Sequence, residues 1–331
     1  MITVEHLTKR YGDFTAVDDL SFEIGEGHVY GFLGPNGAGK STTMNIMTGC
    51  LSATKGHVRI DGYDIFEQPD QAKKQIGYLP EQPPLYMNET PEEYLRFVGE
   101  AKGLRGEELE RQIQEVIEQT KIGNVKKRCI SALSKGYKQR VGIAQALLGN
   151  PKVIILDEPT VGLDPLQIIE IRDLIKQLGQ THTVILSSHI LSEVQTICEK
   201  ILIISKGKLI AFDRPENLEK QLLTPNEIVV TAQASSDQIQ EILSQVKDIS
   251  ECNFENEEQG RTTVQIKTEQ EDIYAVSSSI FFAFADKKVP LLEMALKKGS
   301  LEEVFIELTE KNEEDSAVES EARKHDCSFE T

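Results

Sequence analysis

Long apolar runs and basic residues are both scarce in this chain of 331 residues. Its longest apolar runs, 153–156, 201–204 and 280–285, fall far short of the ~20 residues that a helix needs to cross a bilayer. We therefore expect that the chain does not span a membrane by itself. Lysine and arginine number 36 against 54 acidic residues, which gives a net charge of -18. Because nucleic-acid binding normally needs a basic face, we expect no nucleic-acid partner.

Cysteine is also sparse, and the chain starts without a secretory pattern. The first residues, "MITVEHLTKRYG", have neither the cationic start nor the apolar stretch of a signal peptide and predict a strand. No cysteine pair has a spacing suited to zinc, and an odd total fits a disulfide framework poorly. We therefore expect a reduced, cytoplasmic location and assign no chemistry to the five cysteines, Cys50, Cys129, Cys198, Cys252 and Cys327.

Glycine is concentrated in one short segment, "FLGPNGAGKST", residues 32–42. Gly34, Gly39, Lys40 and Ser41 fit the phosphate-binding P-loop, in which glycines let main-chain N–H groups point at phosphate oxygens. The residues that follow can start a helix, whose N-terminus also favours an anion. Lys40 would reach the β- and γ-phosphates and Ser41 would bind Mg²⁺. An ordinary glycine turn is the competing interpretation.

Changes of hydrophobic period divide the chain into three parts. Short strands up to about residue 80 and aliphatic runs after 151 predict an α/β domain over 1–220, with central parallel strands and a helical insertion at about 84–150. Residues 225–310 predict a small α+β domain of the split β-α-β type, closed by a helix at 300–312. The acidic end, 311–331, predicts a disordered tail.

Three polar positions follow the predicted central strands, and ligands of open α/β sheets bind at the edge where such strands end. Asp157 and Glu158 come directly after the run 153–156, and His189 ends the run 181–189. Asp157 suits Mg²⁺, Glu158 could activate a water, and His189 could contact the γ-phosphate. Each also has a plain alternative, because acidic pairs and lone histidines are common in solvated loops.

Two further segments combine polar residues with a structural boundary. Glu81 and Gln82 lie between prolines where the strands give way to the helical insertion, which suggests either a joint that transmits movement or a plain loop. The helix predicted within residues 133–149 carries Lys135, Lys138 and Arg140 at its start. Positive charge there opposes the helix dipole, so we expect this start to bind a second phosphate.

Together these motifs resemble the ATP-binding subunit of an ABC transporter over residues 1 to about 215. Residues 34–42 resemble Walker A, 153–157 Walker B with the catalytic Glu158, 161–164 the D-loop, and His189 the switch histidine. In "LSKGYKQR" Lys135 and Tyr137 depart from the common signature LSGGQ. This variant, the second domain and "KKGSLEEVFIELT" resemble the ABC-2 type exporters.

The resemblance implies an ATPase that uses ATP and Mg²⁺ to drive a separate membrane permease, working as a homodimer on the inner face of the cell membrane. In such a dimer Ser134 and Gly136 of one copy meet the ATP of the other. A non-transport ABC ATPase acting in a soluble assembly or on nucleic acid is the alternative; a P-loop kinase or GTPase is disfavoured by the signature helix. The implied ATP contacts are Tyr11, Gly34, Pro35, Asn36, Gly37, Ala38, Gly39, Lys40, Ser41 and Thr42; the D-loop residue is Asp164; the Mg²⁺ ligands are Ser41, Asp157 and either Glu81 or Gln82.

Overall fold

The computed structural model describes residues 1–222, 226–258, 260–268, 270 and 272–297. The described chain forms two compact units: the first runs from Met1 to Pro215, and the second begins at Glu216. The helix predicted at 300–312 and the predicted acidic tail lie outside the described residues. No helix of the described chain is long and apolar enough to cross a membrane.

An antiparallel sheet begins the first unit. Its strand order is β2-β1-β4-β5. In β2 polar and buried positions alternate over most of the strand, as expected when one face packs on a core and the other faces solvent. The strands are β1 (Ile2–Tyr11), β2 (Phe14–Ile24), β4 (Lys55–Ile60) and β5 (Tyr63–Asp64).

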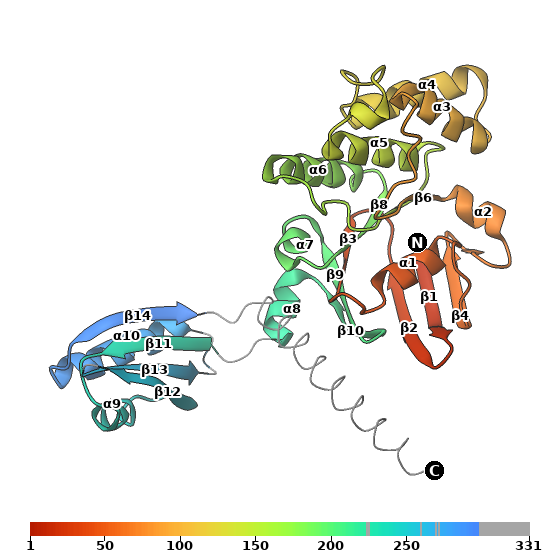
Figure 1. The fold of residues 1–331 in the computed structure, drawn as a ribbon. Coiled ribbons are helices and arrows are strands. Elements are labelled where there is room, and N and C mark those ends of the chain that lie inside the picture. Colours follow the sequence, from red (N-terminus) through yellow and green to blue (C-terminus); the bar gives the residue numbers. More distant parts are fainter. Residues whose placement is uncertain (223–225, 259, 269, 271, 298–331) are drawn as a thin grey trace, which may run out of the picture. The chain divides into compact units, whose positions relative to one another are not determined.

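A second sheet of the first unit has the order β10-β9-β3-β8-β7-β6, and every neighbouring pair except β10 with β9 is parallel (Figure 1). All residues of β3, β7 and β8 are buried, which explains their unbroken aliphatic sequences. The carboxyl ends of these strands therefore meet at one edge. The strands are β3 (Val29–Leu33), β6 (Ile76–Leu79), β7 (Val153–Leu156), β8 (Thr183–Ser188), β9 (Lys200–Ser205) and β10 (Lys208–Asp213).

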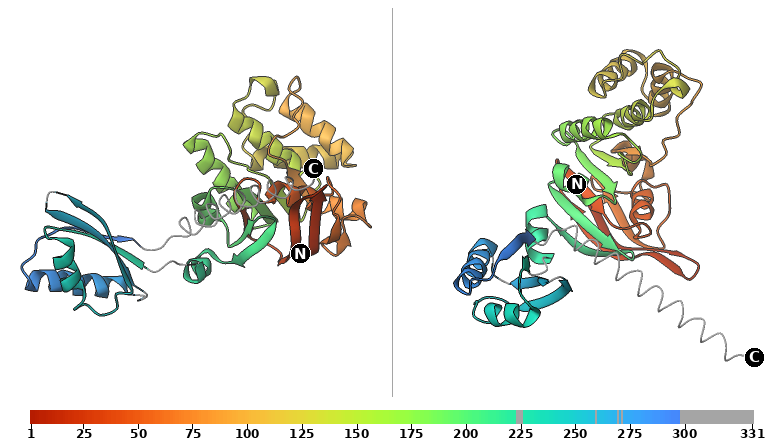
Figure 2. Two further views of the ribbon diagram at one scale, coloured as in Figure 1. Left: turned by 60° about the horizontal axis from the view of Figure 1, so that its bottom comes forward. Right: turned by 60° about the vertical axis from the view of Figure 1, so that its left-hand side comes forward.

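Crossover helices connect the parallel strands, and three other helices form the predicted insertion. Figures 1 and 2 show α3, α4 and α5 grouped together on one side of the first unit. Helix α3 starts with a capping box, in which Thr90 and Glu93 satisfy each other's backbone N–H groups. The helices are α1 (Lys40–Met47), α2 (Pro69–Lys74), α3 (Pro91–Ala101), α4 (Gly106–Gln119), the 3₁₀ helix η1 (Ile130–Ala132), α5 (Lys135–Leu147), α6 (Pro165–Leu178) and α7 (Leu191–Ile197).

The second unit starts within α8 (Pro215–Leu222), after the first residue of this helix. It continues as a four-stranded antiparallel sheet of order β12-β13-β11-β14. This is the arrangement of the split β-α-β fold. Aliphatic side chains and Phe284 fill its core between the sheet and two helices. Its elements are β11 (Asn226–Ala232), α9 (Ser236–Leu243), β12 (Glu251–Glu258), β13 (Arg261–Thr268), α10 (Ile273–Asp286) and β14 (Leu291–Lys297).

Candidate nucleotide site

The loop between β3 and α1 can only be built from glycine at two positions. A Cβ atom on Gly39 would lie 2.5 Å from the carbonyl oxygen of Ala16, and its φ of +101° is itself unfavourable for other residues. A Cβ on Gly34 would lie 2.6 Å from the carbonyl oxygen of Ile204. The loop is thus packed closely against the strands behind it. It delivers Lys40 as the first residue of α1.

The ammonium group of Lys40 is buried inside this loop. Its Nζ donates to the carbonyl oxygens of Gly34 at 2.7 Å and Pro35 at 3.2 Å, and lies 3.8 Å from Oε1 of Glu158. Burial lowers the pKa of Lys40 below its ordinary value, while the nearby carboxylates, Glu158 foremost, act in the opposite direction. A cation held by carbonyl dipoles and facing a cavity is well placed to meet an anion.

Asp157 and Glu158 lie just past the end of β7, and one hydroxyl holds both. Ser187 Oγ donates to Oδ1 of Asp157 at 2.6 Å and accepts from the backbone N–H of Glu158 at 2.8 Å. Ser41 Oγ also donates to Oδ1 of Asp157, at 3.4 Å. Glu158 adopts a φ of +48°, which is strained for a residue with a side chain and turns the chain sharply at this point.

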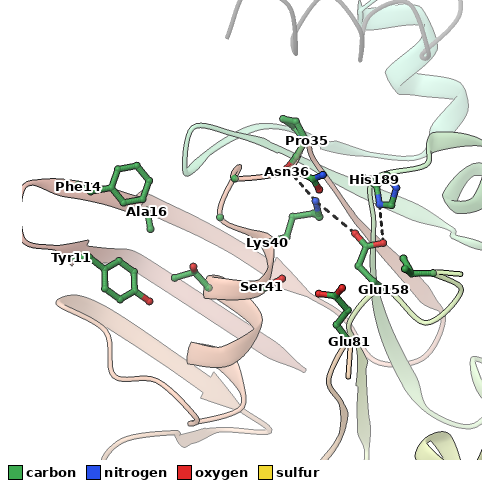
Figure 3. Close-up of a pocket in the computed structure, with 14 residues that line it drawn as sticks. Tyr11, Phe14, Ala16, Pro35, Asn36, Lys40, Ser41, Glu81, Glu158 and His189 are labelled. Atoms are coloured by element: carbon green, nitrogen blue, oxygen red, sulfur yellow. Dashed lines mark hydrogen bonds and ion pairs between the residues drawn. The ribbon is translucent and has the colours of Figure 1, made fainter. Parts of the chain in front are cut away.

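His189 completes a chain of polar contacts that starts at Lys40. Its Nδ1 lies 3.0 Å from Oε2 of Glu158, so the imidazole can donate a hydrogen bond to that carboxylate. Glu158 therefore has Lys40 at one oxygen and His189 at the other, as Figure 3 shows. The side chain of Glu158 is only 9% exposed and that of His189 is 42% exposed, so the histidine is the member of the pair that faces solvent.

Glu158 lines a cavity of about 460 Å³, a size suited to a small ligand, whereas Asp157 and Ser187 do not belong to its lining. Glu81 belongs to the lining and Gln82 does not; Figure 3 shows the Glu81 carboxylate on the same side as Glu158. At the other end lie Tyr11 and Phe14, from β1 and β2. The remaining lining residues are Ala16, Pro35, Asn36, Gly37, Gly39, Lys40, Ser41, Thr42, Val161 and His189.

Comparison with known proteins places this geometry in a family. The ABC transporter family model matches residues 17–161. An uncharacterized ABC transporter ATP-binding protein of Bacillus subtilis, YhcH, is 36% identical over 95% of this chain and 98% of its own length. The chain belongs to the ABC transporter ATP-binding proteins. It is an ATP-hydrolysing subunit of a transporter, and the predicted fold class is confirmed.

Two further relatives of this ABC protein add detail. The bacitracin transport ATP-binding protein BcrA of Bacillus licheniformis is 34% identical over 93% of this chain and 97% of its own length. A solved dimeric structure of the ATP-binding cassette MJ0796, bound to ADP and Pi, is 27% identical and superposes with a TM-score of 0.58 over 65% of this chain and 98% of that one. The resemblance to exporter ATPases agrees with these relatives.

The remaining predicted motifs of the ABC protein lie outside the cavity. Ser134 caps the N-terminus of α5 by accepting from the backbone N–H of Tyr137, and Asp164 caps α6 by accepting from that of Gln167. Gly136 packs against α6, since a Cβ there would lie 2.6 Å from the side chain of Gln167. Neither Ser134 nor Gly136 lines the cavity of its own chain. Gly34 and Ala38 also lie behind its lining.

The predicted positive start of α5 needs a correction. Arg140 is buried, and its guanidinium donates to the carbonyl oxygen of Thr120 at 3.0 Å and to Glu170 at 2.6 Å. It therefore braces the helical subdomain and is not available to a phosphate. Lys138 reaches back to the carbonyl oxygen of Ser131 at 3.4 Å. Of the three cations, Lys135 alone is exposed.

Two residues that surround the site were missed by sequence reasoning. Ser187 stands in a fully buried strand, where a hydroxyl must find a partner, and this position was the available signal. Phe14 is an aromatic residue that remains 62% exposed next to a predicted loop, which a sequence does not reveal.

Proposed function

We propose that this subunit energises a separate membrane permease, most directly for export of a peptide-type antibiotic or a chemically related compound. The single observation that carries the proposal is the contact chain from Lys40 through Glu158 to His189 at the wall of a nucleotide-sized cavity. The relation to BcrA, which is named for bacitracin transport, extends over nearly the whole of both chains and supports an antibiotic as the substrate. The subunit would then sit on the cytoplasmic face of the cell membrane, held there by the permease.

The site residues divide into groups that bind and groups that act on water. Main-chain N–H groups of residues 34–42 and the Lys40 ammonium would hold the β- and γ-phosphates, where fixed donors lose little reorganisation energy. Glu158 would orient and deprotonate the attacking water. His189, already in contact with Glu158, would fix that carboxylate and face the γ-phosphate.

The donors beside Lys40 also fit Mg²⁺. Ser41 Oγ and Asp157 Oδ1 lie 3.4 Å apart, and Glu81 adds a carboxylate to the same cavity. Oxygen donors in small number, completed by phosphate and water, are the usual Mg²⁺ environment. Bound Mg²⁺ would neutralise charge on the phosphates; of the two predicted residues, we propose Glu81 rather than Gln82.

The adenine base would stack at the aromatic end of the cavity. Tyr11 is 49% exposed and Phe14 is 62% exposed, although both are large apolar side chains. Their exposure leaves ring surface for a base, and stacking of this kind contributes about 1–3 kcal/mol per base.

A homodimer would complete the ATP site in trans. Ser134 is exposed at the start of α5, away from the cavity of its own chain, so an ATP contact of its hydroxyl would be made to another copy. Four aliphatic side chains are exposed on the D-loop, the first two turns of α6 and the switch loop: Val161, Leu166, Ile169 and Ile190. An exposed apolar group of this kind beside the active site suits an interface.

The permease contact would lie between Glu81 and α3. Aromatic and sulfur side chains are exposed there: Tyr86 is 50% exposed, Met87 48% and Phe97 50%. The rings of Tyr86 and Phe97 lie 5.1 Å apart. Aromatic residues and methionine are enriched at interface cores, so this group would receive a helix of the permease.

Mixing two inactive variants tests the composite site. Glu158→Gln removes the base, and Ser134→Arg blocks the trans contact, so each homodimer should be inactive. A mixed dimer regains one site, formed by Glu158 of the Ser134→Arg copy and Ser134 of the Glu158→Gln copy. We expect part of the ATPase activity to return, measured with the permease present.

Glu251→Gln, at an exposed carboxylate of the second unit, replaces Glu158→Gln in the control mixture. Its homodimer keeps both sites intact, so this mixture should be active without complementation. Mixtures that dimerise but stay inactive would disprove the trans site or the roles of Ser134 and Glu158.

A further inference from the structure

Glu193, on α7, is a buried carboxylate outside the nucleotide cavity. Glu193 is 4% exposed, and the aliphatic residues near it on α7, Leu191 and Val194, are buried as well. Three side chains reach it from three different segments. Thr160 Oγ1 donates to its Oε2 at 2.6 Å, Ser188 Oγ donates to the same oxygen at 3.3 Å, and the Arg172 guanidinium lies 3.5 Å from its Oε1.

This arrangement is a poor way to gain stability. Removing a carboxylate and a guanidinium from water costs several kcal/mol per ion, and only good geometry and full hydrogen bonding offset that cost. The Arg172 pair is long at 3.5 Å, and Nε of Arg172 is buried with no hydrogen-bond partner. Apolar residues at both 172 and 193 would avoid these penalties. We therefore look for a role of the carboxylate other than stabilising the core.

The positions of its two hydroxyl partners indicate that role. Thr160 lies two residues after Glu158, on the loop that leads to Asp164. Ser188 lies between Ser187, which holds Asp157 and Glu158, and the histidine that contacts Glu158. One oxygen of Glu193 thus joins the loop that carries the base to the loop that carries its histidine partner.

We propose that Glu193 is a positioning residue for ATP hydrolysis. By binding Thr160 and Ser188 with one carboxylate oxygen, it keeps His189 within hydrogen-bonding distance of Glu158. The ends of β7 and β8 are neighbours in the sheet, but the loops beyond them share no backbone ladder. In the described residues, the side chains of Ser187, Glu193 and His189 make the hydrogen bonds that link the two loops. Ser187 fixes the strand ends, and Glu193 fixes the segments that follow.

The test is a kinetic comparison of full-length Glu193→Gln with the unaltered chain. The inference rests on the proposed roles of Glu158 and His189, so Glu158→Gln is measured first. If ATP hydrolysis persists in Glu158→Gln, the proposed roles of Glu158 and His189 are wrong, independently of any result for Glu193. If hydrolysis is lost there, Glu193→Gln should lower kcat about 10- to 100-fold, the range for a misplaced acting group, with KM for ATP within about twofold.

Asp64→Asn is the matched control for loss of a buried, hydrogen-bonded carboxylate. Asp64 is 5% exposed, accepts from the backbone N–H groups of Phe66 and Glu67, and lies outside the cavity. It should lower the melting temperature and leave kcat unchanged. An equal fall in kcat for Asp64→Asn and Glu193→Gln would show a general effect of destabilisation and overturn the proposal.

A double-mutant cycle distinguishes positioning from independent support. His189→Ala should lower kcat by a much smaller factor in the Glu193→Gln background than in the unaltered chain, because the histidine is already displaced from Glu158 there. The same factor in both backgrounds would overturn the proposal.

If Glu193→Gln does not fold, Thr160→Val provides the test of the proposal. It removes one hydroxyl from the carboxylate, keeps the side-chain shape and leaves the Arg172 pair intact. In the folded variant kcat should fall several-fold at unchanged KM. An unaltered kcat would refute the role of this contact.

Discussion

The two units of this protein differ in the charged side chains that they bury. The first unit buries Lys40, Arg140, Asp157, Glu158 and Glu193, most of them around one edge of a parallel sheet. In the second unit, the described buried polar side chains are only Thr262 and Thr268, and each hydroxyl donates to a backbone carbonyl oxygen. Because isolated buried charge is costly, its concentration in one unit marks where chemistry occurs. The interior of the second unit is almost entirely apolar, as expected for a structural core without chemistry.

The largest expected effect concerns the charge at the centre of the first unit. Glu158→Gln keeps the shape of the side chain and removes its basicity, so turnover should fall by about 10²- to 10⁴-fold. ATP binding should persist, because Lys40 and the loop remain. Single-turnover hydrolysis and nucleotide titration measure the two effects separately.

Glu251→Gln, at an exposed carboxylate paired with Lys267 in the second unit, is the control and should leave turnover unchanged. A comparable loss of turnover in Glu158→Gln and Glu251→Gln would contradict the assignment of the chemistry to the first unit.

A core truncation should affect the second unit alone. Phe284 is fully buried in its core, so Phe284→Ala should lower the free energy of unfolding of this unit by about 3–5 kcal/mol. Phe282, on the same helix, is 64% exposed, and Phe282→Ala should change it by less than about 0.5 kcal/mol. Hydrogen exchange of β11 and α10 in the full chain, together with ATP titration, measures both quantities. A weaker ATP affinity in Phe284→Ala would indicate that the units depend on each other.

The loop cation should contribute to affinity to a smaller extent. Lys40→Ala removes a charge-assisted contact to phosphate, worth about 1.5–3 kcal/mol, and should weaken ATP binding roughly 10- to 100-fold. Fluorescent nucleotide titration measures it, with Lys74→Ala as a control, since this exposed lysine on α2 lies outside the cavity. Unchanged affinity in Lys40→Ala would remove the phosphate role of residues 34–42.

The smallest effect is expected from deleting the part of the second unit that follows α8. A chain that ends at residue 222 keeps every residue that lines the cavity, so its affinity for ATP should equal that of the full chain. Titration of a monomeric, folded truncation, with circular dichroism as the check on folding, measures this. A loss of affinity would assign part of the nucleotide site to the second unit.

Much of this architecture was predictable because it depends on local patterns. Unbroken aliphatic runs predicted β7, β8 and β9, and the amphipathic pattern of 84–150 predicted the helical insertion. Arg140 was assigned to a phosphate site because its neighbours are basic, whereas its partners, Thr120 and Glu170, come from other helices. Periodicity reports which face of an element is buried, and it does not report what an individual charge meets there.

The sequence by itself determined the loop at 34–42, because only glycine tolerates its backbone and its close packing, and it determined which strands end in acids and histidine. Tertiary structure decided how these ends are joined. Ser187 between Asp157 and Glu158, and Glu193 between Thr160 and Ser188, are contacts across about 30 positions of the chain, with spacings of 30 and 33 residues for the Asp157–Ser187 and Thr160–Glu193 pairs. Such contacts follow from strand order and register, which bring the loops together and leave no repeat or spacing in the sequence to reveal them.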